Sequence, residues 1–275
     1  MRRYETPLEE ILATRGRNLT VEELTNLVLD AIAADAAWHG YRNIVNAMIR
    51  RGARNFDLIA EYAARKGHAD IVDDMIEAGA RNFDAIAMFA ARGGHASIVR
   101  AMIGRGVRDY HLIAEEAVEG GYYNIVEDMI DMGVSNPDSI AAIAASTGHL
   151  DLVMEMIERG ARDFLSIASS AAREGYSGIL HYLIGNGFVA KIGATYELNE
   201  IAIQAALGGH HEIVNDMISM GATDVNDIAA AAASRGYRDI VEDMISLGAT
   251  DFPHIAAHAF TSGHDDLAER LSSYR

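Results

Sequence analysis

The sequence predicts an all-α, helix-turn-helix repeat solenoid, on three observations. A Gly followed by His or Tyr recurs at a spacing of 27 positions, broken once by a spacing of 34; it stands at Gly40, Gly67, Gly94, Gly121, Gly148, Gly175, Gly209, Gly236 and Gly263. Each interval holds two apolar stripes at helical spacing, and no segment alternates with period two for long enough to predict a sheet. A fixed period of roughly 20 to 50 residues is typical of solenoids, in which each repeat packs only on its neighbours.

The first helix of each repeat is predicted from a short apolar stripe. In the repeat that begins at Gly67, the stripe consists of Ile71, Val72, Met75 and Ile76. These positions share one face of a helix. Gly79 follows, as expected for the glycine that ends a helix.

The second helix of the same repeat is predicted to begin after Asn82, a favourable N-cap residue. Its apolar face is formed by Phe83, Ile86, Ala87, Ala90 and Ala91. The small alanines allow neighbouring helices to approach closely. Gly94 then turns the chain into the next repeat.

The two ends of the array carry atypical units, as expected for repeats with one face in water. Thr6-Pro7-Leu8-Glu9 and Thr20-Val21-Glu22-Glu23 each predict a helix start, the second helix running to about Ala37. We therefore expect N-terminal capping helices over 1–39, eight repeats over 40–262 and a C-terminal half-repeat cap over 263–275. The repeat at 175–208 is long and irregular.

Composition excludes several classes of function. The 275 residues include no Cys, which removes disulfides, thiolate metal sites and a cysteine nucleophile. The formal charge of −17 disfavours a phosphate backbone, so no nucleic-acid partner is expected. No apolar run reaches membrane-spanning length, and no signal peptide is evident, so we expect an intracellular, cytoplasmic protein with no membrane partner. Phosphate-loop, nucleophile-elbow and zinc-helix motifs are absent, which predicts no enzyme activity, no cofactor and no metal.

The repeat resembles the ankyrin repeat in its Gly-His step, Ile-Val…Met-Ile stripe, following Gly-Ala and closing Ala-Ala. Ankyrin units are longer, at about 33 residues, because they carry β-hairpin fingers that this shorter unit lacks. The array is similar to the shortened ankyrin-like arrays of large DNA viruses, which would place the protein in host cytoplasm. The resemblance implies that the second helix of each repeat lines the concave side.

Candidate partner-binding residues are the variable positions of the second helices, because a fixed framework with variable faces is typical of a binding surface. Tyr62, Met88 and Phe89 form a large apolar group on adjacent repeats. Packing between successive helices is the alternative role for this group. The other candidate partner-binding residues at these positions are Glu61, Glu115, Glu116 and Ile143.

Arginines collect in the loops between the helices and predict a basic edge at Arg54, Arg81, Arg108 and Arg162. This edge would seat an acidic partner. The alternative is local pairing with nearby acids, namely Asp57, Asp84, Asp109 and Asp163. Further acids recur on the outward side of the first helices and predict a solvated face; examples are Asp73, Asp74, Asp128, Glu155, Asp216, Glu242 and Asp243.

The histidines after the repeat glycines alternate with tyrosine, which predicts a structural role: an aromatic body packed at the turn and a polar tip bonded to backbone. His254 and His258 share one helical face and raise the question of a metal site, with His264 as a third candidate ligand. No carboxylate motif accompanies them, so we expect none.

The extra segment of the long repeat, 188–198, breaks the pattern. Its apolar residues include Phe188 and Tyr196, and such residues are costly to expose without a use. Insertions in repeat proteins are often functional, which favours a second binding element here. A hinge or a change of curvature is the alternative.

Together these patterns predict a scaffold that binds another protein through the concave helix faces and loop edge, as a monomer or weak homo-oligomer. The alternative is a self-associating structural component of a particle or virion.

Overall fold

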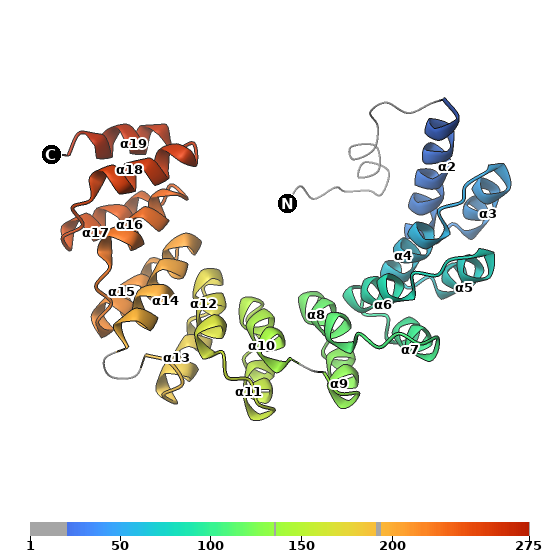
Figure 1. The fold of residues 1–275 in the computed structure, drawn as a ribbon, viewed down its shortest axis with the longest axis horizontal. Coiled ribbons are helices and arrows are strands. Elements are labelled where there is room, and N and C mark those ends of the chain that lie inside the picture. The colour runs from blue at the N-terminus through green and yellow to red at the C-terminus, as the bar shows by residue number, and fades with distance from the viewer. Residues whose placement is uncertain (1–20, 135, 191–193, 275) are drawn as a thin grey trace. The chain divides into compact units, whose positions relative to one another are not determined.

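A computed structural model describes residues 21–134, 136–190 and 194–274, which form 18 helices and no strand (Figure 1). The helices form helix-turn-helix pairs, which confirms the predicted all-α repeat array. The helix predicted near Thr6 and the cap at Thr20 lie outside the described residues. The chain divides into two compact units, Met1–Ser135 and Asn136–Arg275, and each is described by itself.

The first unit has two layers of four helices. The second helices of successive repeats form one layer, and the first helices form the other. The second-helix layer contains α2 (Val21–Trp38), α4 (Phe56–Lys66), α6 (Phe83–Arg92) and α8 (Tyr110–Gly120). The first-helix layer contains α3 (Arg42–Arg51), α5 (Ala69–Ala78), α7 (Ala96–Gly104) and α9 (Tyr123–Asp131).

The second unit repeats this arrangement with five pairs. Its second-helix layer contains α10 (Pro137–Ser146), α12 (Phe164–Glu174), α14 (Thr195–Gly208), α16 (Val225–Ala233) and α18 (Phe252–Thr261). Its first-helix layer contains α11 (Leu150–Glu158), α13 (Ser177–Gly185), α15 (His211–Met220), α17 (Arg238–Ser246) and α19 (Asp265–Ser272).

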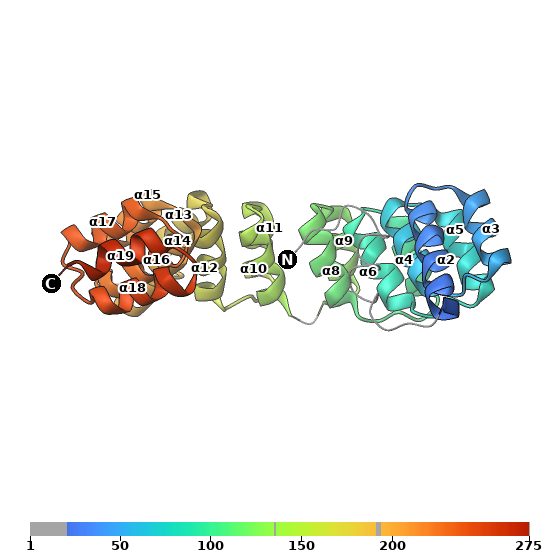
Figure 2. The same cartoon turned by 90° about the horizontal axis from the view of Figure 1, so that it is seen from above.

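Within each unit the second helices pack closely on one another, whereas successive first helices make fewer contacts. Figure 2 shows α4, α6 and α8 side by side in the first unit. The second-helix layer therefore lies on the inner side of the curve of each unit (Figure 1). The reason is side-chain size, because the helices of this layer meet through alanines that are fully buried, such as Ala87 and Ala90.

Most residues of the predicted core stripes are buried, whereas Ile76 and Phe83 are half-buried. Ile71, Val72 and Met75 are buried on α5, and Ile86 is fully buried on α6. The predicted helix ends are also confirmed: the Asn82 side chain accepts from the Ala85 N–H, and Gly79 caps α5 with a φ of 131°. No helix in the described ranges is long and apolar enough to cross a membrane.

Within each unit, the His or Tyr ring of one repeat covers the repeat glycine of the preceding one. Gly67 has a φ of +80°, and a Cβ atom there would lie 2.4 Å from Cε1 of His95. The polar tip is bonded to backbone, since a ring nitrogen of His68 lies 3.3 Å from the carbonyl oxygen of Trp38. Burial lowers the pKa of His95, and a hydrogen bond to the backbone of Arg65 opposes this shift. These contacts confirm the structural role predicted for the repeat histidines.

An Asp or Asn at a fixed repeat position of the second helix joins consecutive repeats. Oδ1 of Asp57 accepts the backbone N–H groups of Arg81 at 2.6 Å and Asn82 at 2.8 Å. The same bonds are made by Asp30, Asp138, Asn199 and Asn226 to the loops of the repeats that follow them. This carboxylate or amide ladder satisfies the loop N–H groups that precede α4, α6, α12, α16 and α18.

The last second helix of the first unit departs from this ladder. His111 occupies the position held by Asp or Asn in most other repeats, and its Nε2 atom lies 3.2 Å from Oε1 of Glu115 in the same helix. The chain therefore lacks the ladder acceptor in the repeat that precedes the boundary between its two units.

Candidate functional site

The variable positions of the second helices meet on the inner face of the first unit. Because α2, α4, α6 and α8 pack side by side, each variable residue adjoins its counterpart one repeat away. The counterpart of Tyr62 is Phe89, and the next in this column is Glu116. This register brings equivalent positions of successive repeats into one continuous surface.

An aromatic row, Trp38–Tyr62–Phe89, crosses three of these helices. The ring centroids of Trp38 and Tyr62 are 5.9 Å apart in an edge-on arrangement, and those of Tyr62 and Phe89 are 6.2 Å apart. The Tyr62 side chain is 7% exposed, so it packs between its neighbours, which is the alternative role given above for this group. Phe89 and Met88 are only half-buried and line the solvent side.

Two basic side chains lie against the first ring of the row. Nζ of Lys66 lies 4.2 Å from the Trp38 ring centroid, and Cζ of Arg65 lies 5.5 Å from it. Both distances are within the range of cation–π attraction. The sequence patterns did not identify Trp38 as a candidate. Its repeat position could have identified it, because the only Trp of the sequence stands where the next two repeats have Arg65 and Arg92.

Glu61 is a partly buried acid beside the row. Burial raises its pKa to about 7, the charge of Asp57 adds to the shift, and a hydrogen bond from Asn82 opposes it. That hydrogen bond joins Nδ2 of Asn82 to Oε1 of Glu61 at 3.1 Å. Glu61 therefore titrates near neutral pH beside the aromatic row and the Asp57 carboxylate.

The shift of Glu61 predicts that replacing it with Gln changes how stability depends on pH. The folded-state pKa is raised, so wild-type stability falls as pH rises from the unfolded pKa of 4.5 towards 7. We expect the Glu61→Gln variant to gain about 1 kcal/mol relative to wild type between pH 5 and pH 8, a value reduced because water screens the carboxyl. Urea unfolding at both pH values measures this difference, and a constant difference would contradict it.

An acidic group continues the surface beyond Phe89. Arg92 bridges two acids of α8, with Nη1 3.2 Å from Oε2 of Glu116 and Nη2 2.9 Å from Oε2 of Glu119. Burial raises the pKa of Glu116 in spite of the Arg92 charge. Glu115 lies beside these acids on the same helix. The inner face thus runs from basic and aromatic groups to acidic ones.

The corresponding positions of the second unit are less apolar. Ile143 is half-buried on α10. His254 and His258 lie with ring centroids 4.8 Å apart, and Nε2 of His254 is 3.2 Å from Oδ1 of Asp227. The His264 ring instead stands over Gly236. Among the residues with described positions, no group of three or more potential ligands is arranged to hold a metal.

The predicted basic edge acts first as a set of helix caps. Nη1 of Arg81 donates to the carbonyl oxygens of Ile76 at 3.0 Å and Ala80 at 2.6 Å. The same two bonds are made by Arg54, Arg108 and Arg162. Cations at helix C-termini satisfy free carbonyls and oppose the helix dipole. The expected ion pairs with Asp57, Asp84, Asp109 and Asp163 are not formed in the described structure; partner binding by the arginines stays a prediction.

The irregular segment packs much of its apolar surface inside its own unit. The Phe188 ring stacks on Phe164 at 4.7 Å between centroids and lies 6.0 Å from Tyr182. Val189 is buried, whereas Tyr196 is 73% exposed. Phe188 therefore has a packing role, whereas Tyr196, in the described part of this segment, is open to a partner.

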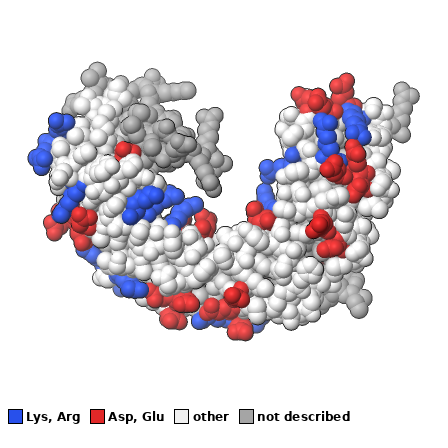
Figure 3. All heavy atoms as spheres, turned by 180° about the vertical axis from the view of Figure 1, so that it is seen from behind, with Lys and Arg blue, Asp and Glu red and all other residues white. Residues whose placement is uncertain are grey.

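Most acids predicted as a solvated outward face lie in ion pairs. Acidic and basic side chains are interspersed on the face seen in Figure 3. The pairs that join successive repeats are Arg42–Asp74, Arg100–Asp128, Arg105–Asp73, His211–Asp243 and Arg270–Glu242. Each exposed pair contributes little to stability. The acids are therefore partnered as well as solvated, because stacking places a cation of one repeat opposite an acid of another.

No protein-family model and no curated protein matches the sequence. Among solved structures, the chain is similar to the pentatricopeptide repeat protein PPR10 from maize, with 14% sequence identity and a TM-score of 0.39. The match covers 98% of this chain and 46% of that protein, so this chain spans about half its length. The likeness concerns helical repeat architecture, and it assigns no partner.

Proposed function

We propose that this chain is a scaffold that binds another protein through the inner face of its first unit. The observation that carries the proposal is the aromatic row Trp38–Tyr62–Phe89, set on a framework whose other positions repeat faithfully. Tyr62 is buried and supports the half-buried Trp38 and Phe89, and aromatic side chains are enriched in protein interfaces. The surrounding helices hold this row in place before a partner arrives, so little ordering is needed on association.

The charges beside the row indicate how a partner would be selected. Lys66 lies at the Trp38 end of the aromatic row, and Glu116 lies beyond Phe89 at the other end. A partner with complementary charges would therefore bind in one orientation along the row. The overall charge of −17 favours a protein with basic groups over a polyanion. The proposal includes binding alone and assigns no reaction to the chain.

The test is affinity capture with the full chain and a pair of matched variants. Met88→Ser with Phe89→Ser removes half-buried apolar groups of the inner face, whereas Met132→Ser removes an exposed one outside this layer. We expect a captured protein to bind wild type and the Met132 variant equally and the double variant about 30-fold more weakly. Circular dichroism must show all three folded. Equal affinity for all three would exclude this face.

A second candidate function, self-association, is favoured by Phe260. This side chain is 67% exposed, although its counterparts in all other repeats are buried Ala or Val residues. It borders a hollow of about 620 Å³ that also includes Pro253, Ala257 and Ala268. If capture retains only the chain itself, and Phe260→Ser lowers a concentration-dependent mass in sedimentation, self-association replaces the scaffold proposal.

A further inference from the structure

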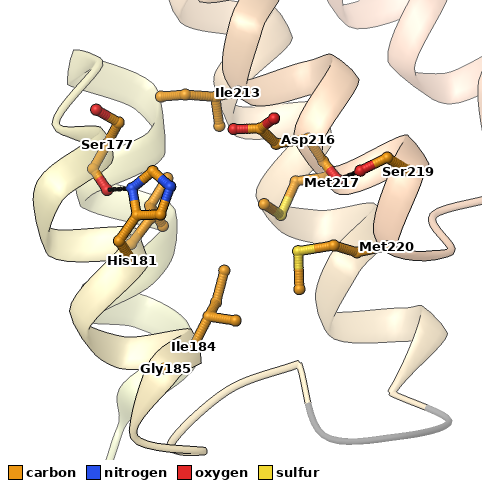
Figure 4. A pocket seen from close by; sticks show the side chains of 10 residues that line it. Ser177, His181, Ile184, Gly185, Ile213, Asp216, Met217, Ser219 and Met220 are labelled. Atoms are coloured by element: carbon orange, nitrogen blue, oxygen red, sulfur yellow. Dashed lines mark hydrogen bonds between the residues drawn. The ribbon is translucent and has the colours of Figure 1, made fainter.

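A hollow of about 320 Å³ lies between α13 and α15 in the first-helix layer of the second unit (Figure 4). Its apolar lining comes from Leu180, Ile184, Ile213, Met217 and Met220. Leu180, Ile213 and Met217 are buried, whereas Met220 is 41% exposed and stands at the rim. The Asp216 side chain lies at the same hollow from the α15 side (Figure 4).

Two of the α13 residues that line the hollow, Ser177 and Gly185, are small and leave space between the two helices. His181 also lines it from α13, and its Nδ1 atom lies 2.7 Å from the carbonyl oxygen of Ser177 (Figure 4). Ser177 occupies the repeat position of Arg42 and His211. In those repeats the long side chain reaches an acid of the next repeat, with Nε of Arg42 2.6 Å from Asp74 and Nε2 of His211 2.6 Å from Asp243.

Asp216 is the acid at the corresponding position, and the short Ser177 side chain does not pair with it. It is the repeat counterpart of Asp74 and Asp243, and also of Asp128 and Glu155. These four acids all have a basic partner: Arg42, His211, Arg100 and Arg159, respectively. Within the described ranges, Asp216 has no ion-pair partner. An exposed acid therefore stands beside an apolar hollow at the place where the repeats of Arg42 and His211 hold a cation.

We propose that this hollow binds an arginine or lysine side chain of a partner protein, together with an adjacent aliphatic side chain. The cation would lie against Asp216, where Arg42 lies in the first repeat, and charge-assisted bonds of this kind are strong. The aliphatic neighbour would rest on Ile184, Met217 and Met220, and methionine side chains adapt readily to different apolar shapes. The site is separate from the inner face, so it does not depend on the scaffold proposal.

The test follows methionine methyl groups by NMR in the full chain. The probe is acetyl-Leu-Arg-Leu-amide, and the matched control peptide carries neutral citrulline in place of arginine. We expect the Met217 and Met220 methyl signals to shift with the arginine peptide, and the citrulline peptide to bind about tenfold more weakly. Unmoved methyl signals, or equal binding of the two peptides, would overturn the proposal.

Three variants separate the site from general charge effects. Asp216→Asn should weaken arginine-peptide binding about tenfold, whereas Asp243→Asn, at the counterpart acid already paired with His211, should leave it unchanged. Ser177→Arg supplies an internal cation, as Arg42 does, and should block the peptide while the chain stays folded. Equal effects of the two Asp substitutions, or full binding by the Ser177 variant, would refute the assigned role of Asp216.

Discussion

Replacing Gly67 with alanine is expected to lower the free energy of unfolding by about 2–5 kcal/mol. Two causes add. Gly67 has a φ of +80°, a left-handed conformation that disfavours residues with a Cβ atom. That atom would also lie 2.4 Å from Cε1 of His95 and force the ring away from the turn. Urea unfolding of the full chain measures the loss.

Gly263→Ala is the matched control for this substitution. Its φ is +81°, nearly that of Gly67, but no described atom lies within 4 Å of the place that an added Cβ atom would take. The control should therefore lose only the backbone contribution, about 1–2 kcal/mol. In a His95→Ala background, the loss caused by Gly67→Ala should fall to the same value. Equal losses at Gly67 and Gly263 would show that the ring contact contributes nothing.

Replacing Asp57 with alanine is expected to cost about 1–3 kcal/mol of stability. Its carboxylate accepts two backbone N–H groups of the next repeat, and these donors lose a charged acceptor when it is removed. The loop that carries them should open more often. Hydrogen exchange at the amides of Arg81 and Asn82 should therefore accelerate, alongside a lower urea midpoint.

Asp84 provides the control because it occupies the same position in the next second helix. In the described structure its side chain makes no hydrogen bond, so Asp84→Ala removes the same helix-terminal charge without a ladder bond. Its cost should stay within a few tenths of a kcal/mol. Asp57→Asn should retain most of the stability, since Asn199 makes the same bonds. A similar loss for Asp57→Ala and Asp84→Ala would contradict the ladder.

Local patterns in the amino-acid sequence predict the repeat, its helices and its core. Apolar periodicity identified the stripe of Ile71, Val72 and Met75, and Asn82 and Gly79 marked the helix ends. These features depend on interactions between near neighbours in the chain, which is why local patterns predict them. The packed role of the repeat histidines was also predictable, because a position that accepts either His or Tyr requires a ring rather than a specific chemistry.

The roles of the polar and aromatic residues instead depend on contacts between repeats. The sequence offers Asp57 as an ion-pair partner for the nearby arginines. In the structure Asp57 instead accepts backbone N–H groups of the next repeat, and Arg81 caps the C-terminal end of α5. The stacking of successive repeats places the Trp38 ring against Tyr62, and it places Asp216 at the same hollow as Ser177. These contacts join residues of different repeats, so they depend on how successive repeats stack, and no local pattern encodes that geometry.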